Sequence, residues 1–164
     1  MDFPGSVANN GGLQIEVGRT AYFIGDVTFA ASSQLQIELG GTLRGDQYDA
    51  VDVAKTASLD GTLAFQSVAP YTDPDVAGSA DTFLVISAGS RSGTFSDISY
   101  GGTPLTAEFT SGDSFRDHVG GGLFRNLTYT ATQVELQNLL ALPGDADGDV
   151  DVDIADFNTR IVHE

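Results

Sequence analysis

The sequence predicts an all-β protein, and three observations lead to this prediction. First, 20 of the 164 residues are glycine, while tryptophan is absent and methionine occurs once. Such a composition is typical of a chain with many turns and few helices. Second, apolar and polar residues alternate in short runs. Third, Gly, Ser, Asp or Pro bounds these runs, as expected for the strands of a half-buried sheet.

The alternation appears first in "LQIEV" (13–17) and returns in "LQIEL" (35–39). Further short runs follow along the chain, namely "AYFI", "DVTF", "YDAVDV", "GTLAFQSV", "DTFLVIS", "LTAEF", "NLTYTA" and "QVELQ". Each run has the length of a strand and is rich in β-branched and aromatic residues, so each predicts a strand. Only the last dozen residues predict a helix.

A weak internal repetition favours a short β-solenoid. "LQIEV" recurs as "LQIEL" after 22 residues, and "GGTL" at 40 recurs as "DGTL" at 60. Periods near 20 to 22 residues, with strands separated by glycine, suit the coils of a solenoid. The repetition fades after residue 70, where we expect a loop and then an antiparallel closing section. A jelly-roll β-sandwich fits the same strand spacing and stays the alternative.

Four longer segments follow one another in a recognisable order: "LQIELGG", "QYDAVDVAKTASLDGTLAF", "ADTFLVISAGSRSGTFSDI" and "LTYTATQVELQ". In this order, residues from about 20 to 138 resemble the passenger-type repeat segments of secreted bacterial surface proteins. The resemblance implies a β-solenoid, or a closely related β architecture, on an extracellular protein. It implies no chemistry.

The chain is strongly acidic, with a net charge of -16 from 23 acidic and seven basic side chains. A field of this sign repels nucleic acid and anionic membranes and attracts cations. Cysteine is absent, which excludes disulfides, thiolate metal sites and cysteine nucleophiles. No run approaches the roughly 18 apolar residues that a membrane span needs, so we expect none.

Six aspartates crowd into twelve positions near the C-terminus, in "GDADGDVDVDIADF": Asp145, Asp147, Asp149, Asp151, Asp153 and Asp156. A twelve-residue calcium loop takes its ligands from positions 1, 3, 5, 7, 9 and 12. With Asp145 at position 1, every one of these positions holds an aspartate, and Asp151 at position 7 contributes its backbone carbonyl. An unbound cluster of this kind would be a standing repulsion. The sequence therefore predicts a Ca²⁺ site rather than a solvated acidic tail.

The residues after this loop place Ile154, Phe157 and Ile161 on one helical face, with Asp153 as a candidate N-cap. A loop followed by a helix, with Asp at position 12, resembles the dockerin type of calcium repeat. Position 6 of the loop is normally glycine but is Val150 here, which costs about 1–2 kcal/mol in that turn. Dockerins that grip a cohesin carry two repeats, and this chain has one. Cohesin binding would need a second repeat beyond Glu164.

Three other motifs favour simpler interpretations. "SGDSFRDH" brings Ser114 near Asp117 and His118 in what we expect to be a polar loop, not a hydrolase triad. "RGD" at 44–46 is expected to be a turn. "YTDPDV" at 71–76 is a weak candidate for a second calcium site.

Two domains are expected: an all-β domain over 1–142, and a dockerin-like calcium loop and helix over 143–164. The start of the chain is not a signal peptide, so we expect a leader to have been removed or the chain to be a piece of a longer protein. The function expected is a non-enzymatic, extracellular or cell-surface structural or adhesive module that binds calcium. Its Gly-rich N-terminus could add as a strand to a neighbouring copy, building a fibre or layer. A carbohydrate-binding module and a dockerin-like tether are the alternatives, and a glycan-active enzyme is a third.

Overall fold

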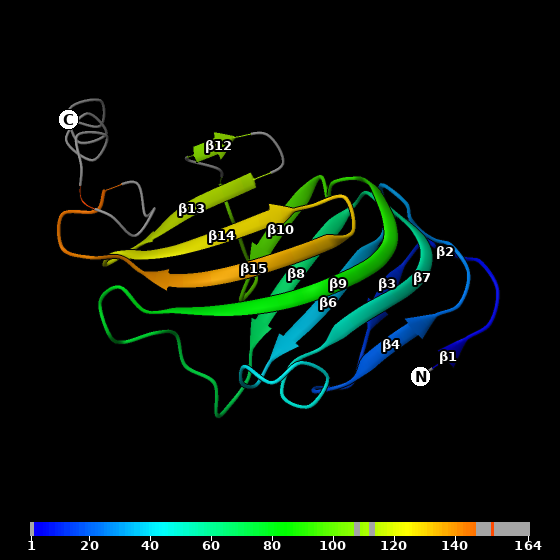
Figure 1. The fold of residues 1–164 in the computed structure, drawn as a ribbon, viewed down its shortest axis with the longest axis horizontal. Helices are drawn as coiled ribbons and strands as arrows, with labels where there is room; N and C mark the ends of the chain where they lie inside the picture. Colours follow the sequence, from blue (N-terminus) through cyan, green and yellow to red (C-terminus); the bar gives the residue numbers. More distant parts are fainter. Residues whose placement is uncertain (1, 107–108, 112–113, 147–151, 153–164) are drawn as a thin grey trace.

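The computed structural model describes residues 2–106, 109–111, 114–146 and Val152, and all regular structure in this part of the chain is β-strand (Figure 1). The strands are β1 (Asp2–Phe3), β2 (Val7–Asn9), β3 (Gly12–Gln14), β4 (Thr20–Phe23), β5 (Val27–Phe29), β6 (Gln34–Leu39), β7 (Ala50–Leu59), β8 (Thr62–Ser67), β9 (Ala80–Gly93), β10 (Asp97–Tyr100), β11 (Thr103–Pro104), β12 (Phe109–Ser111), β13 (Ser114–Gly120), β14 (Leu123–Tyr129) and β15 (Gln133–Leu140). The all-β prediction is confirmed for these residues.

The strands form two sheets. The larger sheet has ten strands in the order β1-β4-β7-β9-β15-β14-β13-β12, with β2 paired to β5 and β5 paired to β7 beside this path. The smaller sheet has five strands in the order β11-β10-β8-β6-β3. The chain crosses between the sheets repeatedly, because β3, β6, β8 and β10 of the smaller sheet alternate with strands of the larger one.

Successive strands within each sheet pair in parallel up to β9 and β10. In the smaller sheet Leu13 pairs with Leu35, Leu35 with Leu63, and Leu63 with Ile98. The "LQIEV" and "LQIEL" runs therefore lie side by side in register, as their repetition predicts. The second repetition does not correspond to a register, because Thr62 of "DGTL" pairs with Gln34. The step between partners grows from 22 to 28 and then 35 residues, since longer connections are inserted along the chain.

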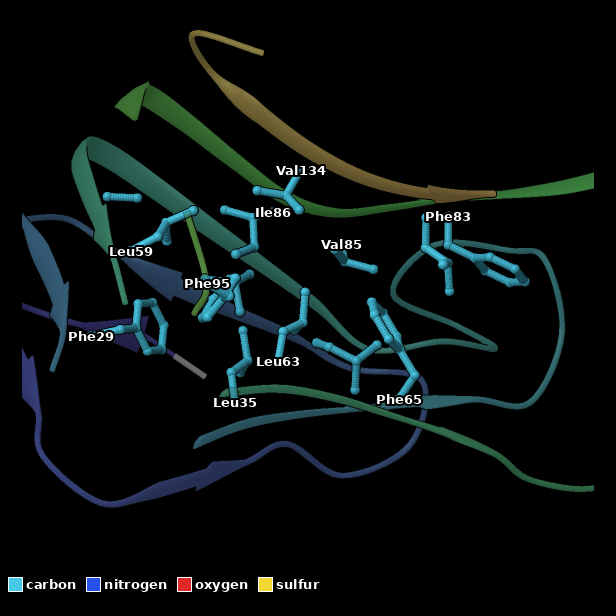
Figure 2. Packing of buried hydrophobic residues seen from close by; sticks show 14 of the residues in the cluster. Phe29, Leu35, Leu59, Leu63, Phe65, Phe83, Val85, Ile86, Phe95 and Val134 are labelled. Atoms are coloured by element: carbon cyan, nitrogen blue, oxygen red, sulfur yellow. The ribbon is translucent and has the colours of Figure 1, made fainter. Parts of the chain in front are cut away.

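The core lies between the two sheets (Figure 2). Phe83, Ile86 and Val134 of the larger sheet face Leu35, Leu63 and Phe65 of the smaller one, and each is at most 1% exposed. Their neighbours along each strand point outward, which produces the alternation seen in the sequence. Burial of these aliphatic and aromatic side chains supplies about 1.5–3 kcal/mol each.

The last strands close the larger sheet in antiparallel fashion: β9 pairs with β15, β15 with β14, β14 with β13, and β13 with β12. The prediction of a polar loop around Ser114 was wrong, because Ser114–Gly120 is strand β13. Its side chains are mostly exposed or half-buried, so a charged sequence without clear alternation still forms a strand. Strand β13 is stabilised by its pairing with β14 and not by a pattern in its own sequence.

The N-terminal segment, which we expected to be free to join a neighbour, pairs within its own chain. Strand β1 lies parallel to β4, and β2 lies parallel to β5. Asp26 fastens this segment: its carboxylate accepts hydrogen bonds from the Ser6 hydroxyl and from the Thr56 amide, at 3.4 and 3.1 Å. Each passage of the chain through both sheets forms one layer, and the layers stack on one another along the sheets. Asp26 thereby joins three successive layers.

Candidate calcium site and its surroundings

The base of the predicted calcium loop is fixed to the end of the β domain. The Gly78 amide donates to the Leu140 carbonyl at 2.6 Å, and the Ala141 amide donates to the Gly122 carbonyl at 2.8 Å. The Asp145 amide then donates to the Leu142 carbonyl at 3.0 Å, forming a turn, and Asp145 is only 7% exposed. The first predicted ligand is therefore held at a defined place on the folded domain.

The other five predicted ligands, Asp147, Asp149, Asp151, Asp153 and Asp156, lie outside the described residues, as does the predicted C-terminal helix. Within the described ranges no group of three or more His, Cys, Asp or Glu is arranged to hold a metal ion. Asp145 supplies the hard carboxylate oxygen that calcium prefers, so its chemistry fits the ion.

Val152 lies close to Gly144. Its Cγ1 atom would lie 3.2 Å from a β-carbon built on Gly144. Position 8 of the predicted loop thus lies beside the residue that precedes position 1. Gly144 has a φ of +109°, which favours glycine there. Val152 is 57% exposed.

A buried polar network lies near the same end of β15. Arg125 of β14 makes a two-pronged ion pair with Asp73, at 2.8 and 2.6 Å, and lies over the Tyr100 ring at 4.0 Å. Asn138 of β15 donates to the Tyr71 hydroxyl at 2.9 Å and to the Asp73 carboxylate at 3.3 Å. Burial raises the pKa of Tyr71 and of Tyr100, so both hydroxyls keep their protons. The network joins the 68–79 connection to the antiparallel strands.

This network also settles where two of the "YTDPDV" side chains lie. Both Asp73 carboxylate oxygens are engaged by Arg125, and Asp75 is exposed. Asp73 therefore acts as the partner of a buried cation in this structure. Sequence reasoning missed the network because Arg125 and Asn138 lie 52 and 65 residues from Asp73.

The arginine of the "RGD" motif is occupied by contacts of its own. Arg44 pairs with Asp52 at 2.7 Å and donates to the Leu84 carbonyl at 2.8 Å. Tyr22, Asp52 and Ser87 form one register row across β4, β7 and β9, with Tyr22 41% exposed. Arg44 and this row line a shallow groove of about 480 Å³ on the larger sheet.

The Ser114, Asp117 and His118 set does not converge. Adjacent residues of a strand point to opposite faces, so Asp117 and His118 diverge. Ser114 and His118 share a face but are separated by about 13 Å along the strand. The His118 ring stacks on Phe124 at 4.7 Å.

Asp49 is a fully buried carboxylate in the connection from β6 to β7. One of its oxygens accepts a hydrogen bond from the Glu38 amide at 2.8 Å. Burial raises the pKa of Asp49 to about 6, although the Glu38 amide acts in the opposite direction. Burial thus makes the Asp49 carboxylate costly to keep ionised at neutral pH.

Comparisons with known protein families, with curated proteins and with solved structures found no match to this chain. Among the described residues we find no helix with the length and apolar character that crossing a bilayer requires.

Proposed function

We propose that the chain is a non-enzymatic structural or adhesive module of an extracellular or cell-surface protein. It is a short β-solenoid with an antiparallel closing section. A dockerin-like loop at its C-terminal end binds calcium through Asp145, Asp147, Asp149, Asp151, Asp153 and Asp156.

The parallel register of both sheets supports the solenoid part of this proposal. Equivalent apolar residues stack over three or four layers, and the chain passes from one sheet to the other in each layer. Each layer buries its apolar side chains against its neighbours, which is how a solenoid is stabilised. In a jelly-roll sandwich the sheets would be built from antiparallel strands.

The geometry at Gly144, Asp145 and Val152 carries the calcium part of the proposal. A hydrogen-bonded turn at the end of the domain carries Asp145, the first of the proposed ligands, and Val152 lies beside Gly144. Five further aspartates lie at the remaining ligand positions of the sequence. Calcium would neutralise this charge and order the tail, so that metal binding contributes folding free energy.

Thermal unfolding with and without calcium, together with light scattering, tests this function. A ligand at 100 times its Kd stabilises a protein by about 2.7 kcal/mol. For a chain of this size we expect the Tm to rise by about 5–10 °C when calcium replaces chelator. A particle mass that also rises with calcium would support calcium-tightened assembly. An unchanged Tm and an unchanged mass would contradict the proposal.

Carbohydrate binding is a second candidate, favoured by the groove beside Tyr22. An exposed aromatic ring can stack on the apolar face of a sugar, while the paired Arg44 and Asp52 offer hydrogen bonds to its hydroxyl groups. Depletion of the protein from solution by insoluble cellulose, chitin or xylan would detect this activity. Loss of depletion in Tyr22→Ala, but not in the outward-facing Thr28→Ala, would assign it to the groove.

A further inference from the structure

The first layer of the stack is uncovered on its outer side. Strands β1, β2 and β3 each pair with a strand of the next layer, and no described strand pairs with their other edges. In Figure 1 these strands lie together at the N-terminal end, far from the end of β15. Both sheets therefore end in open edges at the same place.

Inward-facing side chains of successive layers stack on one another, and in this first layer the last side chains of these stacks are only half-buried. Phe3 stacks on Phe23 with ring centroids 4.6 Å apart, and Phe23 is 1% exposed. Leu13 lies beside Leu35, which is fully buried. Phe3 and Leu13, by contrast, are only partly buried. The difference arises because, among the described residues, no strand lies on the outer side of Phe3 and Leu13.

A hollow of about 350 Å³ opens at this end and continues the apolar surface. Phe3, Leu13, Ile15 and Ala21 line it, together with the charged residues Glu16 and Arg19. The edge beside it is unobstructed, since a β-carbon added to Gly11 or Gly12 would meet no atom within 4 Å. Open strand edges next to uncovered apolar surface are a template for pairing with another chain.

The charge of this end favours a second copy of the same chain. In a protein of net charge -16, residues 2–15 contain a single charged side chain, Asp2. Two copies therefore repel each other least when they approach through this layer.

We propose that two copies of this chain associate through their N-terminal layers around a two-fold axis, with β3 pairing with the partner's β3 and β1 pairing with the partner's β2. An axis perpendicular to the sheets continues both sheets at once, with antiparallel pairing across the interface. The partly exposed Phe3 and Leu13 would then be covered. This inference deepens the self-association part of the proposed function by naming the interface and the partner.

The two ends of the stack do not match each other, so head-to-tail stacking is disfavoured. At the far end the larger sheet continues through four antiparallel strands beyond β9, while the smaller sheet stops after β11. A copy placed there could not extend both sheets. A contact of each N-terminal end with its equivalent closes as a dimer. A calcium-dependent contact at the Asp145 end could link such dimers into longer assemblies.

Sedimentation equilibrium of the intact chain, in chelator and in calcium, tests the dimer. We expect about twice the 17.1 kDa chain mass already in chelator, because the interface lies far from the end of β15, where the predicted calcium loop begins. A monomer at about 100 µM in chelator, a concentration at which a micromolar interface would be nearly saturated, would overturn the inference. If the Tm responds to calcium but no dimer forms, the dimer inference fails and the proposed calcium binding stands. If a dimer forms but the Tm does not respond to calcium, the proposed calcium binding fails and the dimer inference stands.

A proline variant locates the interface. The Gln34 amide donates to the Gly11 carbonyl, and the two groups of a peptide unit point in opposite directions, so the Gly12 amide faces the open edge. Gly12→Pro therefore blocks edge pairing without removing a bond within the chain, and we expect a monomer with an unchanged circular dichroism spectrum.

Asp75→Arg changes an exposed connection away from this edge and is the control that should leave the dimer unchanged. A Gly12→Pro variant that dimerises as tightly as Asp75→Arg would overturn the proposed interface.

Discussion

Removing the Asp73 carboxylate should destabilise the protein more than any change to a neighbouring surface acid. Asp73→Ala leaves the Arg125 guanidinium, whose side chain is 4% exposed, without its ion-pair partner. The Tyr100 ring at 4.0 Å would remain as its main favourable contact. The variant thus tests whether the network fastens the 68–79 connection to the antiparallel strands.

The expected cost follows from the burial of the two partners. Breaking a fully buried ion pair costs about 3–5 kcal/mol, because a charge is left uncompensated. The Asp73 side chain is 32% exposed, so water can partly replace the lost carboxylate. We therefore expect a loss of about 2–3 kcal/mol in the free energy of unfolding. This corresponds to a fall in Tm of about 5–10 °C for a chain of this length.

Urea unfolding followed by circular dichroism measures this cost. Asp75→Ala, two residues away and exposed, is the matched control and should change the free energy by less than about 0.5 kcal/mol. Replacing both partners, in Asp73→Ala/Arg125→Leu, should recover part of the loss because no buried charge is left unpaired. If Asp73→Ala is as stable as Asp75→Ala, the network does not have the structural role inferred for it.

Three further predictions concern the N-terminal layer, the buried acid and the calcium loop. Gly25→Ala places a β-carbon against the Gly5 backbone and should detach β1 and β2. Gly11→Ala is the control, because its β-carbon meets no atom within 4 Å. Proteolysis of residues 2–9 should be faster in Gly25→Ala only. The pKa of Asp49, about 6, exceeds the unfolded value of about 3.9, so the folded chain binds more protons between these values. Its contribution should therefore raise stability by roughly 2–3 kcal/mol as pH falls from 7 to 4, and urea titrations of Asp49→Asn should lack this contribution. Asp149→Asn should weaken calcium binding by at least tenfold in a calorimetric titration and leave the Tm in chelator within 2 °C or so of the parent value.

The alternation of apolar residues was sufficient to predict the strands that build the core. It places Leu35 and Ile37 inward, and both are fully buried. The repeated "LQIE" word even predicted a register, since Leu13 and Leu35 are partners. Each strand must supply an apolar residue at the buried register position, so the alternation of apolar and polar residues is visible in the sequence.

The remaining features depend on distant contacts that leave no local pattern. Strand β13 has few buried side chains and forms because β14 lies beside it. Arg125 and Asp73 look like ordinary surface charges in the sequence, and only the fold brings them together. The growth of the step from 22 to 35 residues hides the later layers from a search for a fixed period. For the predicted calcium loop, the structure describes only Asp145 among the six aspartates. The prediction that they bind calcium rests on their spacing in the sequence.

A calorimetric calcium titration of the intact chain tests the central claim most directly. A twelve-residue loop that ligates through Asp145 and its five partners predicts saturable binding of one Ca²⁺ per chain, with Mg²⁺ bound much more weakly because it demands a smaller, octahedral site. A solvated acidic tail predicts shallow, unsaturated heats that are similar for the two ions and vanish in moderate salt. The first result would support the account, and the second would contradict it.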